Sequence, residues 1–343
     1  MLSANIPSAV IFGCAGPELT SEESAFFQEN NPFGFILFSR NIQEPKQVIR
    51  LVDALRKTTK SPTTPILIDQ EGGEVQRLEA PHWPNFSPVR LFGDLFEIDP
   101  KAGLEACWLN YRIIANILYQ MGITVNCAPV LDIPSASSHP IIGDRAFSCS
   151  AKIVTKLGGI ACKALLDGGV TPVIKHIPGH GRARVDSHHE LPVVETSLAK
   201  LSVTDFKPFH DLSSMPWAMT AHIVFADIDK FAPATSSSIV INDIVRGIIG
   251  FNGILISDDI GMNALRGNFC ERAENCLSAG CDFVLHCSGD IEEMREVMLG
   301  VSTLTSSALD RVSKAIAICN PPKPFDTVTA NKRLQELLKK AGY

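Results

Sequence analysis

Titratable side chains are densest in the segment from Val173 to Pro192, which holds four of the nine histidines of the chain. A short apolar run there ends in Lys175 and His176. After a loop broken by proline and glycine, Asp186 and His188 stand two positions apart. A carboxylate beside an imidazole suits proton transfer, because the carboxylate can fix the ring tautomer and raise its basicity. The segment therefore predicts an acid–base site, with a polar surface loop carrying scattered histidines as the alternative.

Carboxylates also end two other apolar runs. Asp69 follows one of them, and Gly72-Gly73 then allows a sharp turn that could return Arg77 to the same pocket. Asp258 and Asp259 end another run side by side. Neighbouring strand residues point to opposite faces, so we expect one of these two carboxylates to face a site. We expect the other to cap the next helix or bind a nearby arginine or lysine. The alternative at Asp69 is an ordinary exit from a strand into a loop.

Two other kinds of chemistry fit these residues less well. His176 and His180 have the spacing of a zinc-binding pair on a helix, but Pro178 and Gly179 exclude a regular helix there. Serine hydrolysis is possible in principle, with Ser187 inside the predicted dyad, but the sequence has no Gly-x-Ser-x-Gly motif. We expect neither a metal ion nor a cofactor.

Eight short apolar runs must position these side chains. Continuous runs of this kind suit strands that are buried on both faces, as in a parallel sheet. The runs are Ala9–Phe12, Gly34–Phe38, Ile66–Asp69, Thr124–Ala128, Thr171–Lys175, Ala218–Ala221, Ile254–Asp258 and Phe283–Leu285. The polar residues named above stand at the ends of these runs, and His222 follows another of them.

The segments between the runs have the helical period. Pro45–Thr58 repeats apolar residues at helical spacing, Asp99 opens a second helix that Gly122 ends, and Ser238 precedes a third that Gly250 closes. This alternation predicts an α/β fold, a single (β/α)8 barrel of the TIM type, whose reactive groups gather at the carboxyl ends of the strands. A doubly wound open sheet is disfavoured, because no Gly-x-Gly-x-x-Gly follows the first run. Additional C-terminal helices are expected over Ala308–Cys319 and Asn331–Ala341.

Composition restricts the class of protein. The 343 residues, with 45% hydrophobic and 20% charged side chains, are expected to form one domain over 1–343. The net charge of −6 comes without a Lys/Arg cluster, which disfavours nucleic acid. No run approaches the roughly 18 apolar residues of a membrane helix. Ten scattered cysteines without a Cys-x-x-Cys pattern predict free thiols, and so a cytoplasmic location without a signal peptide. We also expect a monomer.

One long pattern in the histidine-rich segment resembles a known family. The segment contains the motif Lys175-His176-Ile177-Pro178-Gly179-His180-Gly181, followed by Asp186-Ser187-His188 and by Leu191-Pro192. This motif resembles a signature of family 3 glycoside hydrolases. The motif more narrowly resembles the bacterial cytoplasmic β-N-acetylhexosaminidases of peptidoglycan recycling. The resemblance continues through Gly34–Ile42, Asp69–Arg77, Asn126–Asp132, Ile142–Phe147, Met219–His222 and Gly253–Met262. The sequence departs from the family pattern at Ala146 and Gly261, and no chemistry is assigned to either.

The resemblance implies roles for particular residues. Asp258 corresponds to the catalytic nucleophile, His188 to the proton donor and later base, and Asp186 to the partner that orients His188. The residues that correspond to those holding a terminal N-acetylglucosamine (GlcNAc) are Asp69, Arg77, Arg145, Lys175 and His176. The implied activity is removal of terminal β-linked GlcNAc from muropeptides (GlcNAc-anhydroMurNAc-peptides). It proceeds with retention of configuration through a covalent glycosyl-enzyme and needs no cofactor or metal.

Two other functions stay open at this point. A phosphorylase could use the same nucleophile, because a histidine that has donated its proton is neutral and repels phosphate less than a carboxylate would. A non-catalytic sugar-binding barrel would be expected to lack Asp258 or His188, and both are present. As a partner we expect only the carbohydrate substrate, with no nucleic acid and no membrane.

Overall fold

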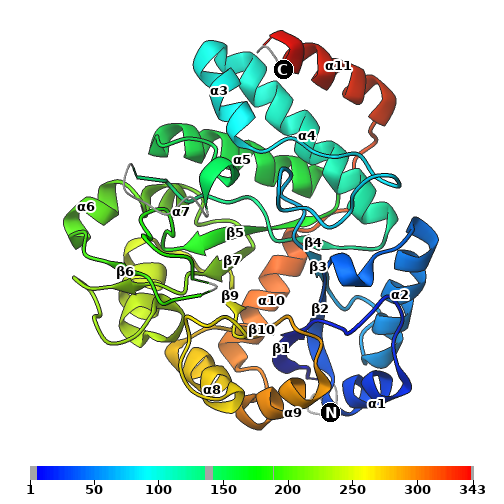
Figure 1. The fold of residues 1–343 in the computed structure, drawn as a ribbon, viewed down its shortest axis with the longest axis vertical. Coiled ribbons are helices and arrows are strands. Elements are labelled where there is room, and N and C mark those ends of the chain that lie inside the picture. The colour runs from blue at the N-terminus through cyan, green and yellow to red at the C-terminus, as the bar shows by residue number, and fades with distance from the viewer. Residues whose placement is uncertain (1–5, 136–141, 188, 341–343) are drawn as a thin grey trace.

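The computed structural model describes residues 6–135, 142–187 and 189–340. Eight parallel strands close into a barrel in the order β1-β10-β9-β7-β5-β4-β3-β2. Helices surround these strands (Figure 1). The barrel strands are β1 (Ser8–Phe12), β2 (Pro32–Leu37), β3 (Ile66–Ile68), β4 (Val125–Asn126), β5 (Thr171–Ile177), β7 (Trp217–Thr220), β9 (Ile254–Asp259) and β10 (Phe283–His286). The (β/α)8 barrel predicted from the sequence is confirmed.

Each predicted apolar run overlaps one of these strands. The runs lack alternation because both faces of every strand are covered, by side chains inside the barrel and by helices outside. A short pair outside the barrel, β6 (Val193–Val194) and β8 (Val224–Phe225), was not predicted. Two residues per strand are too few to give a period that can be read from the sequence.

The helices lie mostly between consecutive barrel strands. They are α1 (Ser21–Asn30), α2 (Pro45–Thr58), α3 (Arg90–Ile98), α4 (Pro100–Gln120), α5 (Ala151–Asp167), α6 (Leu198–Val203), α7 (Lys207–Asp211), α8 (Phe269–Ala279), α9 (Ile291–Gly300), α10 (Ser306–Ile318) and α11 (Thr327–Lys340). Asp99 caps α4 by accepting hydrogen bonds from the backbone N–H groups of Lys101 and Ala102. Gly122 follows that helix with φ at 74°, a conformation that favours glycine.

Two helical details differ from the prediction. The segment after Ser238 forms a π-helix over Val240–Ile248, a winding that apolar spacing alone does not distinguish from an α-helix. The last helix begins at Thr327 rather than Asn331, because Asp326 accepts hydrogen bonds from the N–H groups of its first turn. The predicted end of that helix, Ala341, lies outside the described residues.

Aromatic side chains close the amino-terminal end of the barrel. Phe33 of β2, Trp217 of β7 and Phe283 of β10 stack there, with the ring centroids of Phe33 and Phe283 4.0 Å apart and those of Phe33 and Trp217 5.8 Å apart. The barrel is therefore a packed core at this end. Space for a ligand is left at the opposite end, where the strands finish.

All ten cysteines are free thiols, as predicted. Within the described residues, no helix has the length and apolar character needed to cross a membrane.

Candidate active site

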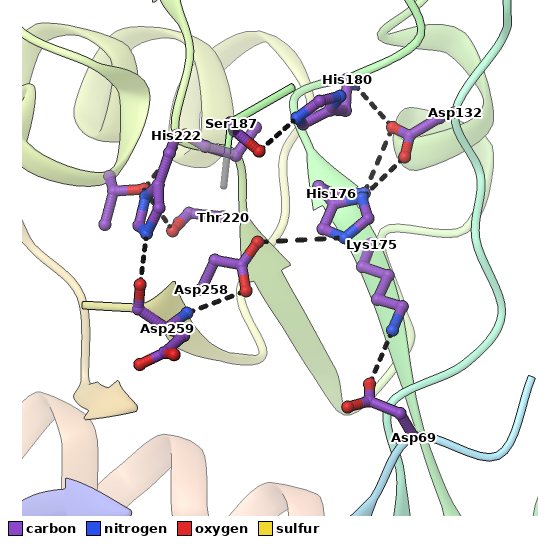
Figure 2. Close-up of polar contacts among 12 residues, drawn as sticks. Asp69, Asp132, Lys175, His176, His180, Ser187, Thr220, His222, Asp258 and Asp259 are labelled. Atoms are coloured by element: carbon purple, nitrogen blue, oxygen red, sulfur yellow. Dashed lines mark hydrogen bonds and ion pairs between the residues drawn. The ribbon is translucent and has the colours of Figure 1, made fainter. Parts of the chain in front are cut away.

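A cavity of about 170 Å³ lies at the carboxyl ends of the barrel strands. Its polar lining consists of Asp69, Glu71, Arg77, Arg145, Lys175, His176, His180, Ser187, Asp258 and Asp259. These residues come from distant parts of the sequence, and several of them point toward one another in Figure 2. Six of the eight residues assigned to a site from the sequence therefore border one cavity. Asp186 is adjacent to the lining residue Ser187, and the eighth, His188, lies outside the described residues.

The Asp258 carboxylate is aimed into this cavity from the end of β9. Its Oδ1 accepts a hydrogen bond from the Asp259 backbone N–H at 2.8 Å, and its Oδ2 lies 4.0 Å from His176 Nε2. Burial raises the pKa of Asp258, but the neighbouring His176 and the Asp259 N–H outweigh burial, and the pKa lies below its ordinary value. Asp258 is therefore an ionised, partly desolvated carboxylate at neutral pH, as a nucleophile must be. Lys175 also lowers the pKa of Asp258, by less than His176 does.

Asp259 turns its carboxylate away from His176 (Figure 2). Its Oδ1 accepts hydrogen bonds from the backbone N–H groups of Gly261 at 2.9 Å and Cys287 at 3.2 Å. The predicted partner of this residue was wrong, because Asn268 caps α8 and backbone amides, rather than a cation, hold Asp259. Burial is the largest effect on Asp259, and its pKa lies above the ordinary value, whereas the pKa of Asp258 lies below it. The two adjacent carboxylates thus have different environments.

A buried carboxylate that was given no role from the sequence, Asp132, holds two histidines. Its Oδ2 accepts a hydrogen bond from His176 Nδ1 at 2.7 Å, and its Oδ1 accepts from the backbone N–H groups of His176 at 3.2 Å and His180 at 2.6 Å. Burial raises the pKa of Asp132, but His176 outweighs burial and the pKa lies below its ordinary value. Because an ionised carboxylate only accepts, the Nδ1 of His176 carries a proton and Nε2 faces Asp258.

Five charged side chains form a cluster on the other side of the cavity. Lys175 Nζ lies 2.8 Å from Asp69 Oδ1 and 2.6 Å from Glu71 Oε1. Arg77 contacts Asp69 at 3.3 Å, and Arg145 donates a hydrogen bond to each carboxylate oxygen of Glu71, both at 2.9 Å. Burial lowers the pKa of Lys175, but the two carboxylates outweigh burial and the pKa lies above its ordinary value. The cluster is therefore fully charged, and it is suited to binding sugar hydroxyls.

Glu71 is the member of this cluster that the sequence reasoning missed. We expect Glu71→Ala to lower the free energy of unfolding by about 3 kcal/mol, because it removes a buried carboxylate that contacts two buried cations, Lys175 and Arg145. Burial raises the pKa of Glu71, but Arg145 and Lys175 outweigh it and the pKa lies below its ordinary value. The ionised Glu71 carboxylate therefore stabilises the folded protein fully at pH values above the pKa that Glu71 has in the unfolded chain. This stabilisation is lost as the pH falls through the lower pKa that Glu71 has in the folded protein.

Urea denaturation across acidic and neutral pH measures this effect. Glu74→Ala, at an exposed position three residues on, is the matched control and should change stability little. If Glu71→Ala and Glu74→Ala lost equal amounts of unfolding free energy at neutral pH, the assignment of Glu71 as a buried, ionised partner of Arg145 and Lys175 would be contradicted.

The predicted acid–base loop is described except at His188. Near its start, His180 hydrogen-bonds through Nε2 to Ser187 Oγ at 3.0 Å, and burial with the nearby His176 lowers the pKa of His180 to about 4. The carbonyl of Asp186 accepts the backbone N–H groups of His189 and Glu190, each at 3.0 Å. The His189 side chain is 81% exposed. His180 is thus a neutral, buried group that ties the two ends of the loop together.

A third histidine that was noted only as a strand-end residue, His222, supports the end of β9. It is fully buried, and its Nε2 donates to the Asp259 carbonyl at 2.9 Å while its Nδ1 hydrogen-bonds to Thr235 Oγ1 at 2.7 Å. These contacts fix the backbone on which Asp258 is carried. Among the described residues, no three His, Cys, Asp or Glu side chains are placed to hold a metal ion.

Comparison with known proteins agrees with this arrangement. Residues 10–317 match the family model described as Glycosyl hydrolase family 3 N terminal domain. The Beta-hexosaminidases of Bordetella pertussis strain Tohama I and Bordetella avium strain 197N are 33% and 31% identical, in each case over 96% of this chain and 93% of the relative. The crystal structure of NagZ from Neisseria gonorrhoeae in complex with N-trifluoroacetyl-D-glucosamine is 29% identical, with a TM-score of 0.84 over 98% of both chains. The chain therefore belongs to glycoside hydrolase family 3.

Proposed function

We propose that this chain is an exo-acting, retaining β-N-acetylglucosaminidase that releases terminal GlcNAc from muropeptides (GlcNAc-anhydroMurNAc-peptides) in cytoplasmic peptidoglycan recycling. Its family and its relatives make it a glycoside hydrolase of the β-N-acetylhexosaminidase class. The observation that carries the proposal is the ionised Asp258 carboxylate, which faces the sugar-sized cavity opposite the charged cluster. We also propose that residues 1–343 act as one catalytic domain and as a monomer.

In the first step, Asp258 attacks the anomeric carbon of the terminal sugar and forms a covalent glycosyl-enzyme. The bond to the leaving oxygen breaks, and His188 donates the proton that this oxygen needs. In the second step water attacks the same carbon, His188 takes the proton from water, and Asp258 is released. Two displacements on opposite faces retain the configuration of the sugar.

The remaining histidines of the loop support assigning the proton to His188. A general acid must be protonated at the working pH, and His180, with a pKa of about 4, is neutral there. His189 is largely exposed, so it lacks the shielding from water that strengthens catalytic electrostatics. The Asp186 carboxylate, whose side chain is 16% exposed, would support the imidazolium form of His188.

The closed end of the barrel supports the proposed exo mode. Phe33, Trp217 and Phe283 fill the barrel below the cavity, and the Lys175–Glu71 pair is nearly inaccessible to solvent. A cavity with a closed floor and buried polar groups fits the end of a glycan, which supports a site for one terminal sugar. Arg77 Nε and His180 Nδ1 are buried atoms without a hydrogen-bond partner in the described part of the chain, and a bound sugar could satisfy both.

Substrate selectivity tests the proposal. We expect kcat/KM on a chromogenic N-acetyl-β-glucosaminide to exceed that on the plain β-glucoside by about 10⁴-fold, because a site built to bind polar groups rejects an analogue that leaves them unpaired. Asp69→Ala should weaken binding and rate together, since it removes a partner of both Lys175 and Arg77.

Equal activity on the two glycosides would contradict the proposed specificity. Products should be analysed with and without inorganic phosphate. GlcNAc alone supports hydrolysis, whereas GlcNAc-1-phosphate would assign the chain to the phosphorylases.

A further inference from the structure

A second cavity, of about 590 Å³, lies in the loops that follow β8 and β9. We name it the basic groove and define it by six of its lining residues: Val193, Val224, Lys230, Phe231, Arg266 and Arg272. One wall carries the β6–β8 pair, and the other carries the start of α8. Both β6 and α8 lie on the left of the barrel in Figure 1. The chemistry described above does not use this groove.

The basic groove adjoins the catalytic cavity. Met262 lines the cavity and Ala264 lines the groove, and both belong to the loop that leaves Asp258. Consecutive Cα atoms are about 3.8 Å apart, so the Cα atoms of these two residues are at most about 7.6 Å apart. The groove therefore begins close to the point where the leaving group of a bound substrate must emerge.

The charged side chains that line the groove are all positive. Lys230, Arg266 and Arg272 line it, whereas no aspartate or glutamate does. Within the described residues none of these cations is in an ion pair. Arg272 donates instead to the backbone carbonyls of Ile260 at 2.8 Å and Met262 at 3.3 Å, which fixes its position and leaves its charge uncompensated. A concentration of positive charge on a chain of net charge −6 favours an anionic ligand.

The groove also offers apolar surface. Phe231 is 86% exposed and Val193 is 50% exposed, although both are large hydrophobic residues. Lys230 Nζ lies 5.0 Å from the centre of the Phe231 ring, so a cation and an aromatic face are presented together. A ligand with both carboxylates and aliphatic groups would match this lining.

We propose that the basic groove binds a carboxylate-bearing peptide on the leaving group of the substrate. This inference rests on the proposed function, because the scissile bond must lie at Asp258 for the leaving group to reach the groove. Carboxylates would contact Arg266, Arg272 and Lys230, and aliphatic side chains would lie on Phe231 and Val193. The groove then adds affinity for peptide-bearing muropeptides without taking part in bond cleavage.

Calorimetry on the inactive Asp258→Ala protein tests the groove independently of turnover. The two ligands are GlcNAc-anhydroMurNAc-tripeptide and the same molecule with its peptide carboxylates converted to amides. We expect the acid form to bind about tenfold more tightly, and the added Arg266→Glu change to remove this preference, because like charges then oppose each other. Rising salt should weaken the preference, since exposed charges are screened.

Lys57→Glu on α2 is the matched control, because it makes the same change of charge at an exposed position on another part of the barrel. It should leave the preference intact. Phe231→Ala, also at an exposed position, should weaken the binding of both ligands about equally. The groove assignment is overturned if the acid and amide forms bind alike, if the acid form does not bind, or if Arg266→Glu and Lys57→Glu have the same effect.

Turnover separates this proposal from the proposed function. In the otherwise unmodified enzyme, Arg266→Glu should lower kcat/KM on the tripeptide substrate about tenfold and change that on a chromogenic N-acetyl-β-glucosaminide by less than about twofold. Failure of the wild-type enzyme to release GlcNAc from any substrate would refute the function, while the binding comparison would still decide the groove. Equal losses on both substrates would refute the groove and leave the function standing.

Discussion

Asp258→Ala is expected to lower kcat on N-acetyl-β-glucosaminides by about 10⁴-fold or more, since a nucleophile acts as part of a catalytic unit. The residue is an ionised carboxylate at the cavity, held by the Asp259 N–H and lying 4.0 Å from His176. Added azide should restore part of the activity by attacking the sugar directly. That single displacement would give the α-glycosyl azide, the opposite anomer from the normal product.

Asp259→Asn is the matched control for this variant. Its carboxylate accepts backbone hydrogen bonds and turns away from His176, and an asparagine keeps one acceptor oxygen. We expect a much smaller loss of kcat, with thermal unfolding used to confirm that both variants are folded. A larger loss for Asp259→Asn than for Asp258→Ala would reverse the assignment of the two carboxylates.

The second large effect is expected at His188, and it should depend on the leaving group. A proton donor matters most when the leaving group departs poorly as an anion. For a sugar leaving group, His188→Ala should lower kcat/KM by about 10²–10⁴-fold, the range typical of general acid catalysis. For a nitrophenyl leaving group, which departs readily as an anion, the same variant should have only a modest effect. Steady-state kinetics on the two substrates measure the difference.

Two further observations check the same role. For the sugar leaving group, the kcat/KM of Asp186→Asn should lie between those of the wild type and His188→Ala. The asparagine keeps the shape of the side chain but removes the negative charge that supports the imidazolium form of His188. Azide should rescue His188→Ala and give the β-glycosyl azide, since a small anion attacks the glycosyl-enzyme without a general base. The same loss on both leaving groups, with no azide product, would place the acid–base group elsewhere, with His180 and His189 as the next candidates.

The barrel could be predicted because its strands are buried on both faces, which leaves continuous apolar runs in the sequence. The convergence of Asp69, Lys175 and Asp258 could be predicted for the same reason, since each ends such a run and the strands are parallel. Arg145 lies in a short 3-10 helix (Gly143–Arg145) rather than at a strand end, so only the family resemblance pointed to it.

Residues that act through a contact distant in sequence could not be found in this way. Asp132 holds the His176 ring across 44 positions, and Glu71 pairs with Arg145 across 74. Neither pairing leaves a periodic or local signal. The partner of Asp259 was missed because it is the backbone of Gly261 and Cys287, and every residue except proline offers a backbone N–H.

The most direct test of the account is to trap the covalent intermediate. A 5-fluoro analogue of a GlcNAc glycosyl fluoride slows both steps, because fluorine destabilises the oxocarbenium-like transition states, while the fluoride leaving group lets the first step proceed. Peptide mapping of the labelled protein by mass spectrometry should then find one sugar on Asp258, and no label on the Asp258→Ala protein. A label on Asp259, or an enzyme that turns over substrate yet is never labelled, would contradict the proposed mechanism.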